Sequence, residues 1–94
     1  MRCIRQIHLD DYGTTNEHIT HVRSSTSTGG VLERQTREDV VRRIDLGLES
    51  YHSHNDATRG EAAVRVRVSQ RGTRYIATVA DGRETNNLLS LPRF

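Results

Sequence analysis

The sequence contains a single cysteine, Cys3, and no apolar run long enough to span a membrane. One cysteine cannot form an internal disulfide or complete a Cys-x-x-Cys zinc or redox motif, and a free thiol is typical of a reducing compartment. A membrane helix needs about 20 apolar residues, and Arg2 and Arg5 interrupt the N-terminus where a signal peptide would be continuously apolar. We therefore expect a cytoplasmic protein that makes no contact with a membrane.

Large apolar side chains are also scarce. Leu, Ile, Val and Phe together account for 21 of the 94 residues, just above the fraction of roughly 20% below which chains are usually disordered. The formal net charge of +2 is too small for the self-repulsion that keeps disordered chains open. A chain of this length forms one domain. We therefore predict a single α+β domain over residues 1–94 with a thin core, which a second copy or another protein completes.

The N-terminal part of the chain predicts two strands. Residues 2–9 and 18–24 have the composition of strands and are separated by turn-forming residues. Ile4 and Ile7 are three positions apart, so alternation does not define the inward face of the first strand. The small polar residues 24–30 that follow are typical of a mobile loop.

A helix is predicted over residues 37–46. Thr36 can cap its first turn, and Gly47 supplies a left-handed stop. Three apolar side chains lie on one stripe of this helix and should pack on a sheet: Val40, Val41 and Ile44.

The C-terminal half predicts a β-hairpin. Residues 64–69 alternate between valine and polar side chains, and residues 73–80 resume a strand pattern after Arg71 and Gly72. With Arg71 and Gly72 as a two-residue turn, one face of the hairpin is apolar and faces the core. The fold expected is an antiparallel sheet of four to five strands with one helix packed on one face. The core pairs expected in this register are Val68 with Tyr75, Val66 with Ala77, and Val64 with Val79.

Residues 85–92 predict a C-terminal latch, with Asn87 capping a short helical turn, three leucines closing the core and Pro92 ending regular structure. The Asn-Asn-Leu-Leu-x-Leu-Pro motif within it resembles the ending of the small bacterial and phage proteins of domain-of-unknown-function family 3892. The valine-rich strand and the Ile-Thr-His-Val-Arg segment at residues 19–23 are also similar to that family. The resemblance covers residues 18–92 and departs at the loop of residues 55–60. It implies a compact α+β domain, and it transfers no catalytic residue because the family has no assigned activity.

Positive charge is concentrated near the predicted hairpin. All fourteen basic residues are arginine, and residues 59–83 carry six of them against two acids. Two explanations of the arginine content stay open: the codon usage of a GC-rich genome, and binding of phosphate or carboxylate by the bidentate guanidinium. The residues that we predict for a binding surface are Arg65, Arg67, Arg74 and Ile76 on the outer face, Arg71 at the tip, and Arg59 before the hairpin.

This surface favours protein binding. Arginine is enriched at protein interfaces, Ile76 would be exposed among the arginines, and a thin core gains from association. We expect a small accessory protein that binds itself, as a homodimer, and an unidentified protein partner. The alternative is contact with a nucleic-acid backbone through the same arginines. Base stacking is not expected there, because Tyr75 is predicted to face the core.

Catalysis and metal binding have weak support in the sequence. His52, His54 and Asp56 would lie near one another in an extended segment, but their spacing is not specific for a metal site. There is no Gly-x-Ser-x-Gly elbow, no phosphate loop with its lysine and no recognisable Cys-His signature. We therefore expect no enzymatic activity, no cofactor and no metal.

Overall fold

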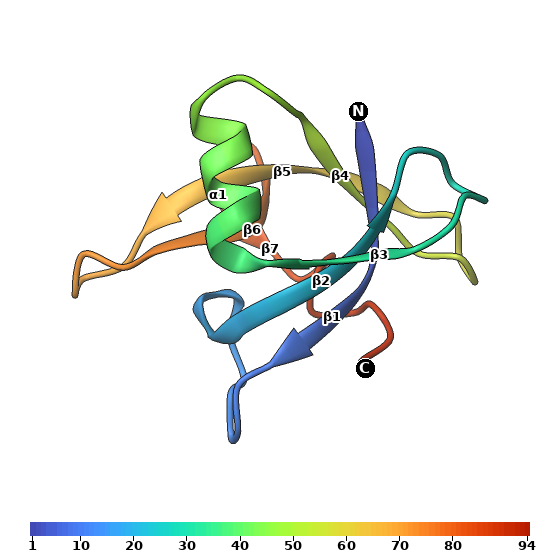
Figure 1. Ribbon diagram of the computed structural model, residues 1–94. Coiled ribbons are helices and arrows are strands. Elements are labelled where there is room, and N and C mark those ends of the chain that lie inside the picture. The colour runs from blue at the N-terminus through green and yellow to red at the C-terminus, as the bar shows by residue number, and fades with distance from the viewer.

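The computed structural model describes all 94 residues and contains seven strands, one α-helix and one short 3-10 helix (Figure 1). The strands form one sheet in the order β3-β2-β1-β4-β5-β6-β7, in which β1 and β4 are parallel and the other neighbours are antiparallel. In chain order the elements are β1 (Arg2–Leu9), η1 (Asn16–His18), β2 (Ile19–Ser25), β3 (Glu33–Thr36), α1 (Arg37–Asp45), β4 (Tyr51–His54), β5 (Glu61–Val68), β6 (Arg74–Ala80) and β7 (Arg83–Thr85).

The expected antiparallel sheet of four to five strands is therefore wrong. The sequence did not predict β3, β4 or β7, which are four, four and three residues long and consist mainly of polar side chains. Such segments have little intrinsic preference for the extended state, and they become strands because a neighbouring strand pairs with their backbone. The parallel pairing of β4 with β1 also needs a long crossover, which β2, β3 and α1 provide.

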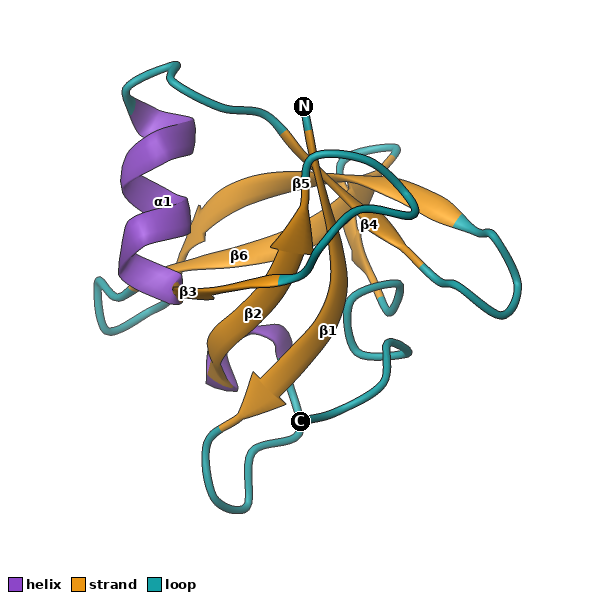
Figure 2. Cartoon of the chain, turned by 45° about the vertical axis from the view of Figure 1, so that its right-hand side comes forward, coloured by secondary structure: helices purple, strands orange, loops and turns teal.

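The sheet is curved around one core. Figure 2 shows β1, β2 and β3 in front of β5 and β6, with α1 along one side. The helix contacts β2, β3, β5 and β6. The five inner strands of the sheet, the helix and the C-terminal segment contribute to one cluster of buried residues: Ile4, Ile7, Ile19, Val22, Val40, Val41, Tyr51, Val64, Ile76, Leu88 and Leu91.

Two β-bulges explain the irregular spacing of the isoleucines. The pairing of β1 with β2 skips Arg5 on one strand and Thr20 on the other. Each extra residue reverses the alternation of side chains once. Ile4 and Ile7 are consequently both fully buried, although they are three positions apart.

The predicted helix is confirmed. It spans Arg37–Asp45, and the hydroxyl of Thr36 accepts a hydrogen bond from the amide of Asp39 at 3.1 Å. Gly47 ends it with a φ of 69°, a left-handed conformation that suits glycine. Val40 and Val41 are buried, and Ile44 packs against the core.

The predicted register of the hairpin is wrong by one residue. Val66 lies opposite Ile76 and Val68 lies opposite Arg74, because the turn has three residues, 70–72, closed by a hydrogen bond from the amide of Ser69 to the carbonyl of Thr73. A one-residue shift moves every side chain of a strand to the other face. The residue of β6 that faces the helix is therefore Ile76. The residues expected on that face, Tyr75, Ala77 and Val79, lie on the other one.

The C-terminal segment lies beside β1. Leu88 and Leu91 are buried in the core, and the amide of Ile7 donates to the carbonyl of Pro92 at 3.0 Å, while the amide of Phe94 donates to the carbonyl of Ile7 at 3.1 Å. The loop that was expected to begin at residue 24 begins after β2, since Ser24 and Ser25 belong to that strand and are fully buried. No helix has the length and apolar character needed to cross a membrane.

Candidate binding cleft

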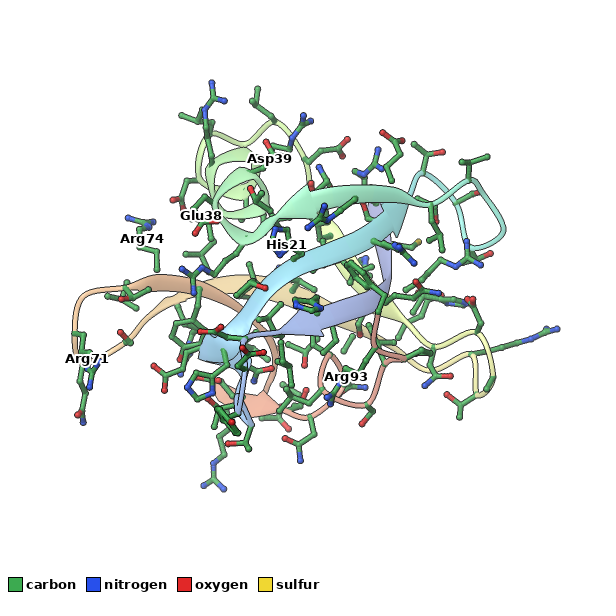
Figure 3. The ribbon with its side chains drawn as sticks, turned by 60° about the horizontal axis from the view of Figure 1, so that its bottom comes forward. His21, Glu38, Asp39, Arg71, Arg74 and Arg93 are labelled. Atoms are coloured by element: carbon green, nitrogen blue, oxygen red, sulfur yellow. The ribbon has the colours of Figure 1, made fainter.

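The structure distributes the predicted binding residues over several surfaces. Arg65 and Arg67 share one face of the hairpin, whereas Arg74 lies on the face that packs toward α1. Figure 3 shows Arg71 at the tip of the hairpin and Arg74 on the helix side. Arg59 belongs to the separate loop of residues 55–60. Ile76 is fully buried, so its predicted exposure is wrong.

Two of these arginines are already neutralised by carboxylates. Nη2 of Arg74 lies 2.5 Å from Oδ2 of Asp45 in α1. Nε of Arg67 lies 3.7 Å from Oε2 of Glu84, which also accepts a hydrogen bond from the hydroxyl of Tyr75. Burial, together with the Glu84 carboxylate, raises the pKa of Tyr75. The hairpin therefore does not present the continuous basic face that the sequence predicted.

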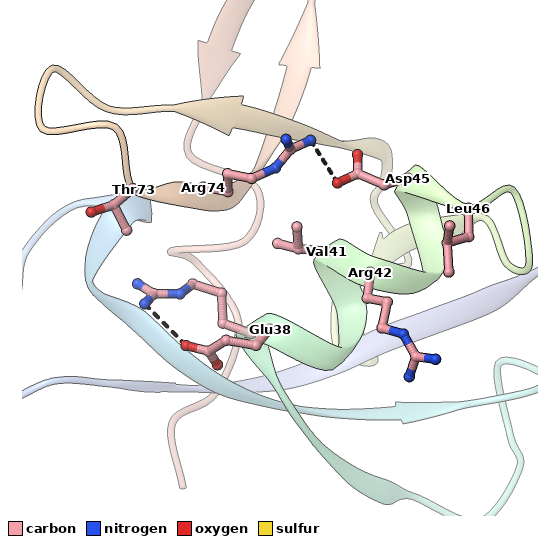
Figure 4. A pocket seen from close by; sticks show the side chains of 8 residues that line it. Glu38, Val41, Arg42, Asp45, Leu46, Thr73 and Arg74 are labelled. Carbon is pink, nitrogen blue, oxygen red and sulfur yellow. Dashed lines mark hydrogen bonds and ion pairs between the residues drawn. The ribbon is translucent and has the colours of Figure 1, made fainter.

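A cleft of about 570 Å³ lies between α1 and the start of β6 (Figure 4). The side chain of Val41 points into it, and Leu46 at its edge is 61% exposed. The ion pair between Arg74 and Asp45 joins the hairpin to the helix across this cleft. The lining residues are Arg37, Glu38, Val41, Arg42, Asp45, Leu46, Thr73 and Arg74.

Most charges of the cleft are paired within the protein. Nη2 of Arg37 donates to Oε1 of Glu38 at 3.1 Å, and Nη1 donates to the carbonyl of Glu17 at 3.2 Å. Nε of Arg37 is buried without a hydrogen-bond partner. Arg42 has no carboxylate within 4 Å and is the free cation at this site.

A second, more polar cavity of about 870 Å³ adjoins the cleft and shares Arg37 and Thr73 with it. The tip of the hairpin forms one side, where Val68 is 60% exposed and Arg71 has no ion pair. Residues of η1 and of the loop before it form the other side. The hairpin therefore stands between two concave surfaces, with Arg37 at their boundary.

A family model described as "Protein of unknown function (DUF3892)" matches residues 1–92. The chain belongs to the DUF3892 family. This confirms the resemblance seen in the sequence and extends it to the first strand. No curated protein and no solved structure matches the chain.

The histidines of this DUF3892 protein are engaged with neighbouring side chains. β4 carries His52 and His54, and His54 is buried with its Nδ1 3.1 Å from Oε1 of Glu61 and its Nε2 3.7 Å from Oδ1 of Asp56. Asp56 is held by Arg5, whose hydrogen bonds lower the pKa of this carboxyl. His52 contacts the sulfur of Met1. No three potential ligands are grouped in a way that would hold a metal ion.

Sequence reasoning missed the cleft residues on α1. Val41 was assigned to the core stripe, whereas it also lines the cleft, and Arg42 and Leu46 were not singled out. The available signal was the pair Leu46 and Leu48, two leucines flanking a helix-ending glycine outside the apolar stripe. The cleft contains no Ser, Cys or His side chain, and its carboxylates Glu38 and Asp45 are paired with Arg37 and Arg74.

Proposed function

We propose that this DUF3892 protein is a small non-enzymatic binding protein that holds an extended segment of a partner protein in the cleft between α1 and the β5–β6 hairpin. The observation that carries this proposal is the cleft itself, which exposes Leu46 over the buried Val41 while its main charges are already paired. A volume of about 570 Å³ is in the range of pockets that bury a small ligand or an anchoring side chain.

The apolar part of the cleft supplies the affinity. Leu46 is 61% exposed at the edge of the cleft, and Leu48, two residues further along the chain, is 64% exposed. Apolar area that a partner covers is removed from water. The ion pairs Arg37–Glu38 and Arg74–Asp45 fix the walls before a partner arrives. A pre-formed site avoids part of the entropy cost of ordering side chains on binding.

The free charge of the cleft indicates which segment fits. Arg42 lies on the rim without a carboxylate partner, and a guanidinium forms bidentate hydrogen bonds with a carboxylate. We therefore expect the bound segment to carry an apolar anchor next to Asp or Glu. The alternative surface for a nucleic-acid backbone loses its support, because Arg67 is paired and Arg74 lies on the opposite face.

The proposal is tested with peptides. Random peptides displayed on phage are selected on the immobilised protein, and a selected peptide is labelled and titrated by fluorescence anisotropy. We expect selection of acidic peptides with a large apolar residue, and Leu46→Ser and Arg42→Glu should each weaken binding about ten-fold. The amide chemical shifts that change when the peptide is added should belong to residues of α1 and β6.

Two variants serve as matched controls. Val31→Ser removes an exposed apolar side chain outside the cleft, and Arg83→Glu reverses an exposed charge on β7; neither should change the affinity. Equal affinities for the cleft and control variants, or shift changes confined to other elements, would refute the proposal. Self-association stays a prediction from the sequence, and sedimentation of the free protein as a monomer at every concentration would contradict it.

A further inference from the structure

The outer face of the β1–β2–β3 part of the sheet carries a separate cluster of rings and arginines. Ile7 and Val22 are opposite each other and fully buried. The pairs on either side of them, Gln6 with Arg23 and His8 with His21, therefore point away from the core. Figure 2 shows these three strands in front of β5 and β6, with their outer side toward the reader. We define the outer face by Gln6, His8, His21, Arg23, Arg34 and Phe94.

Planar side chains lie against one another on this face. The guanidinium carbon of Arg23 is 4.2 Å from the centroid of the Phe94 ring, and Nη1 of Arg23 donates to Oε1 of Gln6 at 3.1 Å. The ring centroid of His8 lies 5.8 Å from the ring centroid of Phe94 and 6.0 Å from that of His21. His8 is exposed and Phe94 and His21 are partly exposed, so an incoming ring can reach this cluster.

The same face carries unbalanced positive charge. Arg23 lies directly opposite Arg34 across the pairing of β2 with β3, and neither has a carboxylate within 4 Å. Like charges in directly opposite positions destabilise a sheet. Burial lowers the pKa of His21, and the charges of Arg34 and His8 lower it further, while Glu38 opposes them to a smaller extent. A bound anion that reaches both arginines would be attracted by both guanidinium groups.

We propose that the outer face binds single-stranded nucleic acid, with a phosphate between Arg23 and Arg34 and a base stacked on the Phe94 ring, next to His8. Adjacent cations and stacking rings on an open sheet are complementary to a ligand that combines phosphates with planar bases. A duplex keeps its bases stacked internally and cannot use the rings. The site lies on a different surface from the cleft and does not depend on the function proposed above.

The experiment is a titration of fluorescein-labelled single-stranded DNA and RNA of mixed sequence, followed by anisotropy, with a duplex as comparison. Neutralisation of one phosphate should weaken binding of a single strand about 2.6-fold between roughly 50 and 200 mM salt. Phe94→Ala should weaken binding about five-fold or more through lost stacking, and Phe94→Tyr should restore it. Amide shift changes should fall on β1, β2 and β3.

A matched pair of double variants distinguishes binding at this site from general attraction of nucleic acid by positive charge. Arg23→Gln with Arg34→Gln should abolish the salt dependence, whereas Arg59→Gln with Arg83→Gln removes the same charge from exposed positions elsewhere and should leave the affinity nearly unchanged. Absence of binding at the lower salt, equal losses in the two double variants, or tighter binding of the duplex would overturn the proposal. The Arg23→Gln, Arg34→Gln variant should keep its peptide affinity, because neither residue lines the cleft, so failure of one proposal is distinguishable from failure of the other.

Discussion

Arg5 and Asp56 are 51 positions apart in the chain and form a two-point ion pair, with Nε and Nη2 of Arg5 donating to the two carboxylate oxygens of Asp56 at 3.0 and 2.8 Å. Arg5 is the bulged residue of β1, and its Nη1 donates to the carbonyl of Gly30 at 2.8 Å. A bulge redirects a side chain that a regular strand would place elsewhere. Here it joins the first strand to two loops that are distant in the sequence.

The first prediction concerns Asp56. Its hydrogen bonds with Arg5 hold its pKa below the ordinary value, so the folded state binds fewer protons than the unfolded state as the pH falls. The stabilisation is complete above the ordinary pKa of about 4 and is lost as the pH falls through the lowered pKa. Asp56→Asn should flatten the stability profile in this acidic range, as measured by urea unfolding across pH. A profile identical to that of the wild type would contradict it.

The second prediction concerns His21. Burial and the positive charges of Arg34 and His8 lower its pKa, so the unfolded state takes up a proton at a higher pH than the folded state. The free energy of unfolding should therefore fall as the pH drops through about 6.5 toward the lowered pKa. His21→Gln should remove this slope. The chemical shift of the His21 ring, followed by NMR, gives the pKa directly, and a value at or above that of an unfolded histidine would refute the interpretation.

The third prediction tests the hairpin register through the interior of β6. Ile76 is fully buried on the helix side, while Val68, on the same face of the hairpin, is 60% exposed. Ile76→Ala should lower the free energy of unfolding by about 2–5 kcal/mol. Val68→Ala is the control and should cost less than about 0.5 kcal/mol. A small loss for Ile76→Ala together with a larger loss for Val68→Ala would favour the register in which Ile76 is exposed and Val68 faces the core.

Local signals allowed part of the fold to be predicted from the sequence. The helix could be located because its start and stop signals, Thr36 and Gly47, lie next to its ends in the sequence. The strands β3, β4 and β7 depend on pairing with distant segments, and their own side chains are mainly polar. The alternation of apolar and polar residues also fails for β6, where residues 75–78 are all buried, because α1 and η1 contact this strand.

The candidate sites depend even more on distant contacts. Arg74 was singled out in the sequence, but its place at the cleft follows from the one-residue change of register that brings it to Asp45. The outer face could not be foreseen, because it needs two bulges and the return of the C-terminal segment to β1 before Phe94 meets Arg23 and His8. Both sites are built by tertiary contacts between segments far apart in the chain.

The last prediction concerns the turn that sets this register. Gly72 has a φ of 81°, and a Cβ built on it would meet no atom within 4 Å, so a substitution there acts through backbone conformation alone. The left-handed conformation costs a residue with a Cβ about 1–2 kcal/mol. Gly72→Ala should therefore lower the free energy of unfolding by about 1 kcal/mol.

Gly29→Ala is the matched control, since its Cβ also meets nothing and its φ is not in the left-handed range. This variant should be neutral or slightly stabilising. Urea unfolding of both variants measures the difference. Equal stability of the two would mean that the turn does not need the left-handed residue that a three-residue hairpin loop places at this position.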